Sequence, residues 1–284
     1  MTFQTRPLAP ALGAEIVGVD LSRPLDDDVM AQIRAVWHEH ALVLFRGQSI
    51  TAEDQKRFTR FFGEFQTPHA GAQVGQETLV IGNVTVNGVV GELPTGEMQF
   101  HQDRCYSEKP TLASILYGIE IPSAGGNTKW ASMYRAYDRL SPALKQRIAG
   151  MHVRFVFDYS EYDAAKPNAW EDAPHFVHPL VIAHPETGRP ALFCNRLMAD
   201  QLVELPRDEG RALIEELCLA IEAPGNVYEH AWRPGDVVMW DNLATAHART
   251  DFDPSERRYM RRTTVKGPAP VAYAGCNAEA AARV

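Results

Sequence analysis

Two side chains that can bind a metal stand two positions apart in Phe100-His101-Gln102-Asp103. Residues i and i+2 of a strand point to one face, so His101 and Asp103 would present an imidazole and a carboxylate side by side. With a second histidine they complete the 2-His-1-carboxylate triad, which holds non-haem Fe(II) and leaves other coordination positions open. His247 is the best candidate for that third ligand. It lies far along the chain, so only a fold that unites distant strands could bring it to His101.

A second motif is rich in arginine and runs from Arg257 to Val265. With strand periodicity, Arg258 and Arg262 share one face. If that face is interior, two buried cations are costly unless each meets an anion, and guanidinium groups suit the bidentate binding of carboxylates. The pair could therefore hold two different anionic molecules. A solvated basic strand is the alternative reading of the same pattern.

The third motif is Gly125-Gly126-Asn127-Thr128-Lys129-Trp130. Paired glycines indicate a tight loop or a close approach of the backbone to another group. Thr128 would offer a hydroxyl donor at the start of a strand. Taken alone, the motif is typical of an ordinary turn.

Hydrophobic spacing predicts the elements that must position these residues. A helix is expected after Asp26, a second begins near the N-cap residue Thr51, and a third runs from about Asp208. Strand patterns cover residues 41–45, 79–86, 112–121, 153–157, 177–183, 191–194, 228–232, 236–240 and 258–265. No G-x-G-x-x-G follows a strand, and strands and helices do not alternate regularly. We therefore predict an α+β protein built on a β-sandwich, and a two-sheet jelly roll would unite distant strands as the metal site requires.

Composition narrows the class of protein. The chain has 284 residues and a formal net charge of −8, which argues against a protein that coats nucleic acid. Its apolar runs are too short for a membrane span, and its first residues lack the apolar core of a signal peptide. The four cysteines are scattered, which disfavours a disulfide framework and a thiolate zinc site. These features together predict a cytoplasmic protein without a nucleic-acid or membrane partner.

In their order along the chain, these motifs resemble the taurine dioxygenase / 2,4-dichlorophenoxyacetate dioxygenase (TauD/TfdA) family. This is the clavaminate-synthase-like branch of the Fe(II)- and 2-oxoglutarate-dependent oxygenases. The resemblance covers approximately residues 8–267 and is specific in its ordered combination. The stretches that carry it are His101-Gln102-Asp103, Gly125 to Trp130, Trp240-Asp241-Asn242 through His247, Arg257 to Val265, Leu42 to Gln48 and Phe61-Phe62-Gly63.

The resemblance implies roles for individual residues. It identifies His101, Asp103 and His247 as the iron ligands. Arg258 would form a salt bridge with the distal carboxylate of 2-oxoglutarate, assisted by the hydroxyl of Thr128. Arg262 matches the arginine that grips the acidic group of the primary substrate. His69 stands near a position where the taurine enzyme has a histidine that contacts its substrate, although the flanking sequence differs.

The resemblance also implies a fold and an activity. The fold would be a double-stranded β-helix with flanking helices, formed as one domain by residues 1–267 and followed by a C-terminal tail, 268–284. The enzyme would use Fe(II), O2 and 2-oxoglutarate to oxidise a C–H bond of a sulfonate, carboxylate or aryloxyalkanoate, releasing succinate and CO2. The same iron site could support desaturation or oxidative cleavage. The segment 91–99 is expected to line the substrate pocket, and the enzyme to be a dimer or tetramer.

Two other functions fit parts of the sequence. A zinc hydrolase could use His175, His178 and His184, but prolines on both sides of the first two exclude a regular helix there, and no H-E-x-x-H occurs. A jelly roll that binds a ligand without catalysis would not need His101, Asp103 and His247 together. Dependence on Fe(II) distinguishes this second alternative from the oxygenase.

Overall fold

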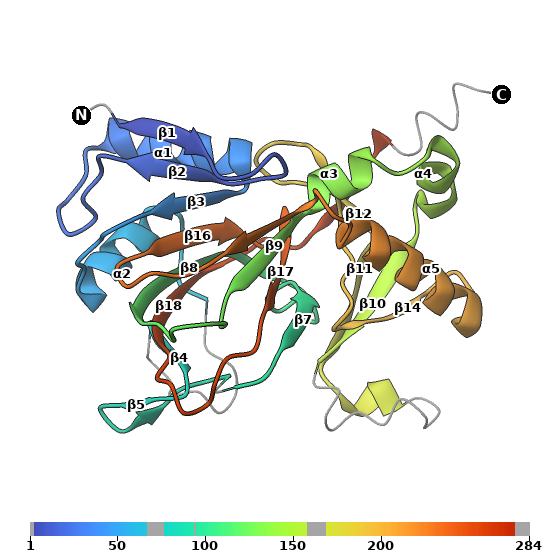
Figure 1. The fold of residues 1–284 in the computed structure, drawn as a ribbon. Coiled ribbons are helices and arrows are strands. Elements are labelled where there is room, and N and C mark those ends of the chain that lie inside the picture. Colours follow the sequence, from blue (N-terminus) through green and yellow to red (C-terminus); the bar gives the residue numbers. More distant parts are fainter. Residues whose placement is uncertain (1–2, 67–76, 94, 158–168, 276–284) are drawn as a thin grey trace.

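The computed structural model describes residues 3–66, 77–93, 95–157 and 169–275. Two sheets of mainly antiparallel strands form its centre (Figure 1). The larger sheet contains, in spatial order, β1 (Gln4–Pro7), β2 (Ala14–Val17), β3 (Leu42–Phe45), β16 (Val237–Asp241), β8 (Thr111–Glu120), β18 (Tyr259–Lys266) and β4 (Leu79–Gly82). The smaller sheet contains β15 (Val227–His230), β9 (Thr128–Ser132), β17 (Thr245–Arg249) and β7 (Met98–His101).

The central strands β3 and β16 of the larger sheet are buried on both faces, which explains their nearly continuous apolar sequences. In β3, Val43 and Phe45 pack beneath α1 (Asp27–His40) and α2 (Ala52–Arg60), whereas Leu42 and Leu44 face the smaller sheet. The hydrophobic core that contains Leu42 and Leu44 includes residues of both sheets, among them Trp130 of β9. The two central sheets therefore enclose one interior, and the helices cover the outer face of the larger sheet.

The two N-terminal helices begin where the sequence predicts. Thr51 forms a capping box with Asp54, in which each side chain bonds the other residue's backbone N–H. Asp26 precedes α1 but makes no side-chain cap hydrogen bond. The helix α5 (Arg207–Ile221) also matches the predicted third helix and buries Leu213 and Leu217.

A separate core lies on the far side of the smaller sheet, at the right of Figure 1. There α5 packs on β14 (Ala199–Leu202), which pairs with β10 (His152–Val156) and, through it, with β11 (His175–Pro179). The remaining elements of this region are α3 (Met133–Asp138), α4 (Pro142–Ile148), a 3-10 turn at Ala169–Asp172, β12 (Val181–Ala183) and β13 (Pro190–Leu192).

Several predicted boundaries differ from the structure. The strand expected over residues 79–86 is divided into β4 and β5 (Thr85–Val86), and β5 forms a hairpin with β6 (Val89–Val90). The strand expected over 177–183 is likewise divided between β11 and β12. Within the expected tail, β19 (Val271–Ala272) pairs with β12.

Two further compositional expectations can be compared with the structure. Cys105, Cys194 and Cys218 are buried and form no disulfide, and Cys276 lies outside the described residues. No helix in the described ranges is both long enough and apolar enough to cross a membrane.

Candidate metal centre and adjoining cavities

The structure brings His101, Asp103 and His247 together. β7 and β17 are antiparallel neighbours, and His247 lies directly opposite His101 in the register. Nε2 of His101 is 4.0 Å and Nε2 of His247 is 3.9 Å from Oδ1 of Asp103. The three potential ligand atoms all lie within 4.8 Å of one another. One expectation was wrong: β7 ends at His101, so Asp103 lies in the following turn and not on the strand.

Both histidines are in the state that a metal ligand requires. Nδ1 of His101 lies 2.9 Å from the carbonyl oxygen of Gln99, to which only a protonated Nδ1 can donate, so Nε2 keeps its lone pair. Burial, followed by the neighbouring His101, lowers the pKa of His247 to about 3. Burial also lowers the pKa of His101. Neutral imidazoles therefore face Asp103 at physiological pH.

Asp103 is held as an oriented carboxylate. Its Oδ2 accepts a 2.7 Å hydrogen bond from Oγ of Ser114, whose oxygen accepts one of 3.2 Å from the amide of Asn242. Burial acts to raise the pKa of Asp103, but the charge of Arg262 and the hydrogen bond from Ser114 act against it, and that pKa lies well below its usual value. Ser114 does not stand out in the sequence because it is a small polar residue within the mainly apolar strand β8.

These donors fit Fe(II). Two imidazole nitrogens and one carboxylate oxygen lie close together, and none of these three atoms carries a proton. They form the donor set of the facial triad. A second cluster of His38, His184 and Asp241 does not fit a metal as well. Nδ1 of His184 accepts backbone N–H groups of residues 186 and 187, so its proton is on Nε2, which donates to Asp241 at 2.8 Å.

The histidines of the zinc-hydrolase alternative are dispersed. His178 hydrogen-bonds the carbonyl oxygen of Ser107, and His175 that of Ala173. Within the described ranges, neither belongs to a cluster of potential metal ligands.

Arg258 is a buried cation without an anionic partner among the described residues. Its side chain is 1% exposed, and one terminal nitrogen donates a weak 3.4 Å bond to the carbonyl oxygen of Gly126. Nε and the other terminal nitrogen have no hydrogen-bond partner there. Burial, reinforced by nearby Arg249, lowers the pKa of Arg258 to about 9. No carboxylate of the described residues therefore offsets the cost of burying this charge.

The glycine pair and Thr128 form the wall beside Arg258. A Cβ atom on Gly126 would lie 3.2 Å from Nε of Arg258, and one on Gly125 would lie 2.3 Å from the carbonyl oxygen of Asp251. These short distances confirm that the paired glycines allow the backbone to approach neighbouring groups closely. Oγ1 of Thr128 accepts a 2.9 Å bond from the indole of Trp232, which leaves its own hydroxyl hydrogen to donate. Thr128, Arg258 and His247 border one small cavity.

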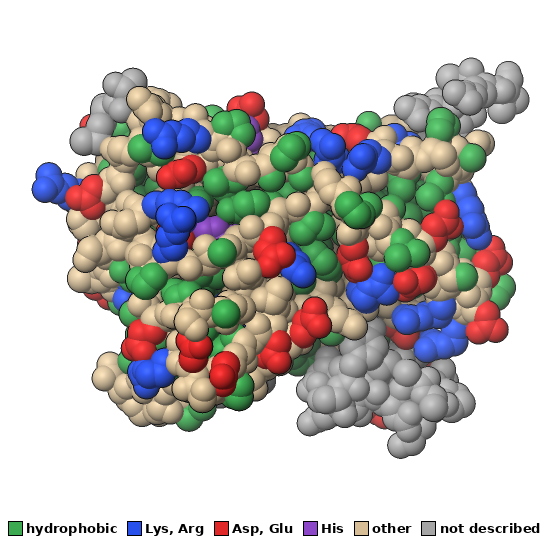
Figure 2. Space-filling view, viewed as in Figure 1, with side chains coloured by type: hydrophobic (Ala, Val, Ile, Leu, Met, Phe, Trp, Pro, Cys, Tyr) green, Lys and Arg blue, Asp and Glu red, His purple; other side chains and the backbone are tan. Residues whose placement is uncertain are grey.

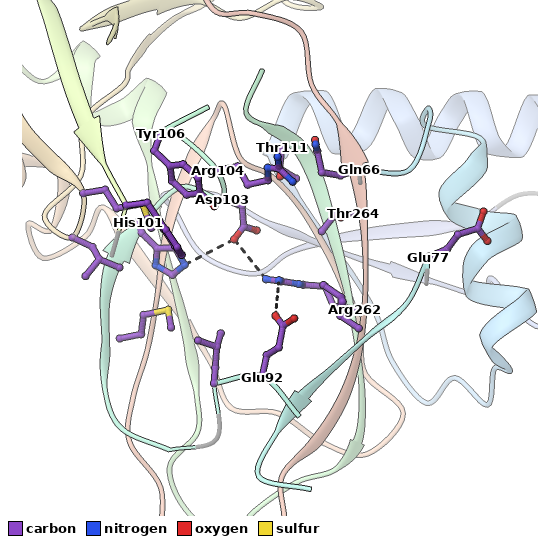
Figure 3. Close-up of a pocket in the computed structure, with 16 residues that line it drawn as sticks. Gln66, Glu77, Glu92, His101, Asp103, Arg104, Tyr106, Thr111, Arg262 and Thr264 are labelled. Carbon is purple, nitrogen blue, oxygen red and sulfur yellow. Dashed lines mark ion pairs between the residues drawn. The ribbon is translucent and has the colours of Figure 1, made fainter. Parts of the chain in front are cut away.

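Arg262 points into a larger cavity of about 410 Å³ that also contains His101 and Asp103 (Figure 3). Its two terminal nitrogens are 3.5 Å from Oδ1 of Asp103 and 3.8 Å from Oε2 of Glu92. These contacts are ion pairs longer than a good hydrogen bond, and Nε has no partner in the described part of the chain. The inward-facing arginine pair expected from strand periodicity is therefore present, with each guanidinium beside a cavity.

The remaining expectations concern the cavity wall. Glu92, Leu93 and Met98 line it, as expected for the segment 91–99. His69 lies outside the described residues. The other lining residues include Gln66, Leu79, Arg104, Tyr106, Phe157, Leu197 and Met198. Figure 2 shows the outer surface from the side of Figure 1, where acidic and basic side chains are interspersed.

Proteins of similar sequence cover almost the whole chain. The family model described as "Taurine catabolism dioxygenase TauD, TfdA family" matches residues 4–264. Pentalenolactone F synthase of Streptomyces avermitilis is 32% identical, over 91% of this chain and 92% of its own. (S)-phenoxypropionate/alpha-ketoglutarate-dioxygenase of Sphingobium herbicidovorans is 30% identical, over 93% and 95% respectively.

Two solved structures are also similar to this chain. A taurine dioxygenase from Burkholderia xenovorans has a TM-score of 0.80 and 32% identity, covering 96% of this chain and 92% of that one. AAD-2 in complex with Mn(II) and N-oxalylglycine has a TM-score of 0.81 and 28% identity, covering 95% and 99%.

Proposed function

The chain belongs to the TauD/TfdA family of 2-oxoglutarate-dependent dioxygenases, and on that basis we propose that it oxidises a C–H bond of a small organic anion held by Arg262. It is an oxidoreductase whose cofactors are Fe(II), 2-oxoglutarate and O2. The single observation that carries the substrate proposal is the guanidinium of Arg262, which borders the cavity lined by two of the proposed iron ligands and whose Nε has no hydrogen-bond partner among the described residues.

We assign Fe(II) to His101, Asp103 and His247. When bound, the metal supplies the oxygen activation that couples decarboxylation of 2-oxoglutarate to oxidation of the substrate. The chain contributes two neutral imidazoles and a carboxylate that is already ionised, so the ligands need not lose protons at neutral pH. Ser114 and Asn242 orient the carboxylate.

We assign the distal carboxylate of 2-oxoglutarate to Arg258, with the hydroxyl of Thr128 as a further donor. Among the described residues, Nε and one terminal nitrogen of this buried guanidinium have no hydrogen-bond partner, so both can donate to an anion. The small cavity that Arg258 and Thr128 share also touches His101 and His247, so a ligand anchored there reaches the metal site. Burial excludes water and strengthens this pairing.

Arg262 lies in β18, whereas Arg258 directly precedes that strand. In this proposal Arg262 takes the acidic group of the primary substrate. Side chains of Leu79, Leu93, Met98 and Leu197 provide apolar contacts for the rest of the molecule. Hydroxylation, desaturation and oxidative cleavage remain alternative outcomes of hydrogen removal at one site. Sulfonates, carboxylates and aryloxyalkanoates are the candidate substrates.

We further propose that the two facing sheets are the double-stranded β-helix of a single domain, residues 1–267. The shared interior of the two sheets and the similarity to solved dioxygenase structures support this assignment. A dimer or tetramer is proposed by family resemblance, and light scattering of the purified protein tests it.

The deciding experiment is a substrate screen that measures succinate release and O2 uptake with Fe(II) and 2-oxoglutarate. A sulfonate, carboxylate or aryloxyalkanoate should raise both rates above the level without substrate. A protein that binds small anions but makes no succinate with any of them would instead be a ligand-binding jelly roll. The His101→Ala variant controls for succinate formed independently of the site.

A further inference from the structure

Trp232 is bonded to the proposed cosubstrate site from behind. Its indole Nε1 donates a 2.9 Å hydrogen bond to Oγ1 of Thr128, which itself borders the cavity beside Arg258. We propose that Trp232 is a positioning residue, whose N–H occupies one lone pair of the Thr128 hydroxyl and so directs the hydroxyl hydrogen toward the distal carboxylate of 2-oxoglutarate. This inference deepens the proposed function and rests on its assignment of that carboxylate to Arg258 and Thr128.

The hydrogen-bonding capacity of the two groups decides the direction of their bond. An indole N–H can only donate, whereas a threonine hydroxyl has one hydrogen and two acceptor lone pairs. Thr128 must therefore accept from Trp232, and its own hydrogen stays available for another partner. Within the described ranges, the Thr128 hydroxyl makes no second hydrogen bond. A carboxylate in the cavity is the acceptor that would complete its bonding.

The register of the smaller sheet places Trp232 beside Thr128. Thr128 begins β9 and lies opposite His230, the last residue of β15, in the antiparallel pairing. Trp232 follows His230 by two residues, so the chain that leaves β15 carries the indole to the start of β9. Both side chains are buried, with Thr128 4% and Trp232 7% exposed. Burial strengthens the hydrogen bond between them.

The larger sheet holds the indole ring from the other side. A Cβ atom on Gly118 of β8 would lie 3.3 Å from Cε3 of Trp232, so glycine allows the ring to approach this strand closely. The N–H of Gly118 donates to the carbonyl oxygen of Asp236, and its own carbonyl accepts from Gly235, both at 2.9 Å. These bonds attach the turn that follows Trp232 to β8.

A buried polar network fixes the backbone on both sides of Trp232. Oδ2 of Asp236 accepts from Nε2 of His230 at 2.9 Å and from the backbone N–H of Arg233 at 3.0 Å. His230 and Asp236 are each 1% exposed, and the rings of His230 and Trp232 contact edge to face at 4.8 Å. The surroundings of Trp232 thus hold the ring in the orientation that directs its N–H to Thr128.

A threonine hydroxyl without this donor would bind a carboxylate less well. A lone pair directed at the carboxylate would repel it, and a freely rotating hydroxyl would have to be ordered when the ligand binds. The N–H of Trp232 removes both costs before 2-oxoglutarate arrives. Trp232 should therefore affect the affinity for the distal carboxylate, and it should do so only through Thr128.

Matched variants and two ligands test this assignment. Trp232→Phe removes the N–H but keeps an aromatic ring. Trp37→Phe is the control, because Trp37 is also buried, lies in another core, and has no hydrogen-bond partner for Nε1 among the described residues. Thr128→Val removes the hydroxyl, alone and combined with Trp232→Phe. Calorimetry with Mn(II) present gives Kd for 2-oxoglutarate and for 2-oxopentanoate, in which a methyl group replaces the distal carboxylate.

We expect Trp232→Phe to raise the Kd of 2-oxoglutarate about five- to tenfold, as for the loss of one hydrogen bond, and to leave that of 2-oxopentanoate unchanged. Trp37→Phe should change neither Kd. In the Thr128→Val background, Trp232→Phe should add less than about twofold, since the hydroxyl that it orients is absent. Replacing Trp232 by 3-benzothienylalanine, which exchanges the N–H for sulfur in a ring of similar shape, should reproduce the effect and serves if the phenylalanine variant does not fold.

An unchanged Kd of 2-oxoglutarate after loss of the Trp232 N–H would overturn the inference. An equal loss of 2-oxopentanoate binding would mean that the ring only supports the cavity wall, and would overturn it as well. So would an undiminished effect in the Thr128→Val background, because Trp232 would then act independently of the hydroxyl. A wild type that bound 2-oxopentanoate as tightly as 2-oxoglutarate would instead overturn the proposed assignment of the distal carboxylate, and this inference with it.

Discussion

Oγ of Ser114 donates a 2.7 Å hydrogen bond to Oδ2 of Asp103. This bond connects the two sheets, because Ser114 lies in β8 of the larger sheet, whereas His101 and His247 lie in β7 and β17 of the smaller one. Ser114 is buried and paired with Trp240 on one side and Thr264 on the other. The position of the carboxylate relative to the imidazoles is therefore set by how the two sheets pack.

Ser114→Ala should weaken metal binding because Asp103 loses the donor that orients it. Removal of such an outer hydrogen bond typically lowers metal affinity about 10- to 100-fold. Titration of the metal-free protein with Mn(II) measures the change. Ser141→Ala is a matched control, since Ser141 caps α4 and should affect only stability, by about 1 kcal/mol. Equal Mn(II) affinity in wild type and Ser114→Ala would contradict this role.

His101→Ala and His247→Ala should each abolish stoichiometric Fe(II) binding and succinate release, because two remaining ligands do not complete the triad. Metal content of the purified variants and succinate formation with 2-oxoglutarate check this prediction. His152→Ala is the control, since His152 pairs with Glu204 away from the cavities. Retention of one Fe(II) per chain in both triad variants would refute the ligand assignment.

Arg258→Met should stabilise the protein without 2-oxoglutarate and eliminate stabilisation by it. Methionine removes a buried, uncompensated charge, so we expect the free energy of unfolding to rise by about 1–4 kcal/mol. Urea unfolding with and without 2-oxoglutarate measures both effects. The adjacent Arg257 is exposed and pairs with Glu120, so Arg257→Met should leave stability nearly unchanged and keep the response to 2-oxoglutarate. A 2-oxoglutarate response that survives in Arg258→Met would place the cosubstrate elsewhere.

Arg262→Glu should strongly raise the Michaelis constant for the primary substrate while leaving the Michaelis constant for the cosubstrate, 2-oxoglutarate, essentially unchanged. Loss of a charge-assisted contact in a partly closed site costs about 2 kcal/mol or more, which corresponds to roughly 30-fold. Initial-rate kinetics with each of the two compounds varied in turn measure both constants. Arg262→Gln should act in the same direction but less strongly, since it adds no charge beside Asp103. An equal loss of substrate and cosubstrate binding would argue against separate roles for the two arginines.

Acid should destabilise the metal-free protein through His247. Its pKa is about 3 in the folded state and near 6.5 when unfolded, so between these values the unfolded chain binds more protons. Stability should therefore fall as pH decreases from about 6.5 toward 3, by up to about 1.4 kcal/mol per pH unit from this residue. Urea unfolding at several pH values should show a shallower dependence for His247→Gln. The same slope in both proteins would contradict the prediction.

Some of the fold could be predicted from local patterns. Thr51, followed by Asp54 and an apolar face, locates α2, because capping depends only on residues within one turn. The start of β9 at Thr128 was expected, whereas β17 was missed because it is short and pairs only with strands far away in the sequence. The expected strand around Asp103 failed for a related reason: β7 ends at the point where the chain turns toward β8.

The chemical types available at the site can be recognised in the sequence, since His101, Asp103, His247, Arg258 and Arg262 stand out by identity and spacing. Which of them converge, and how each is oriented, follows from the tertiary structure. His247 meets His101 through strand register, while Asp103 is anchored from the opposite sheet by Ser114. Glu92 reaches Arg262 only because its backbone joins β4. Such contacts depend on pairings between distant segments, and no local pattern encodes them.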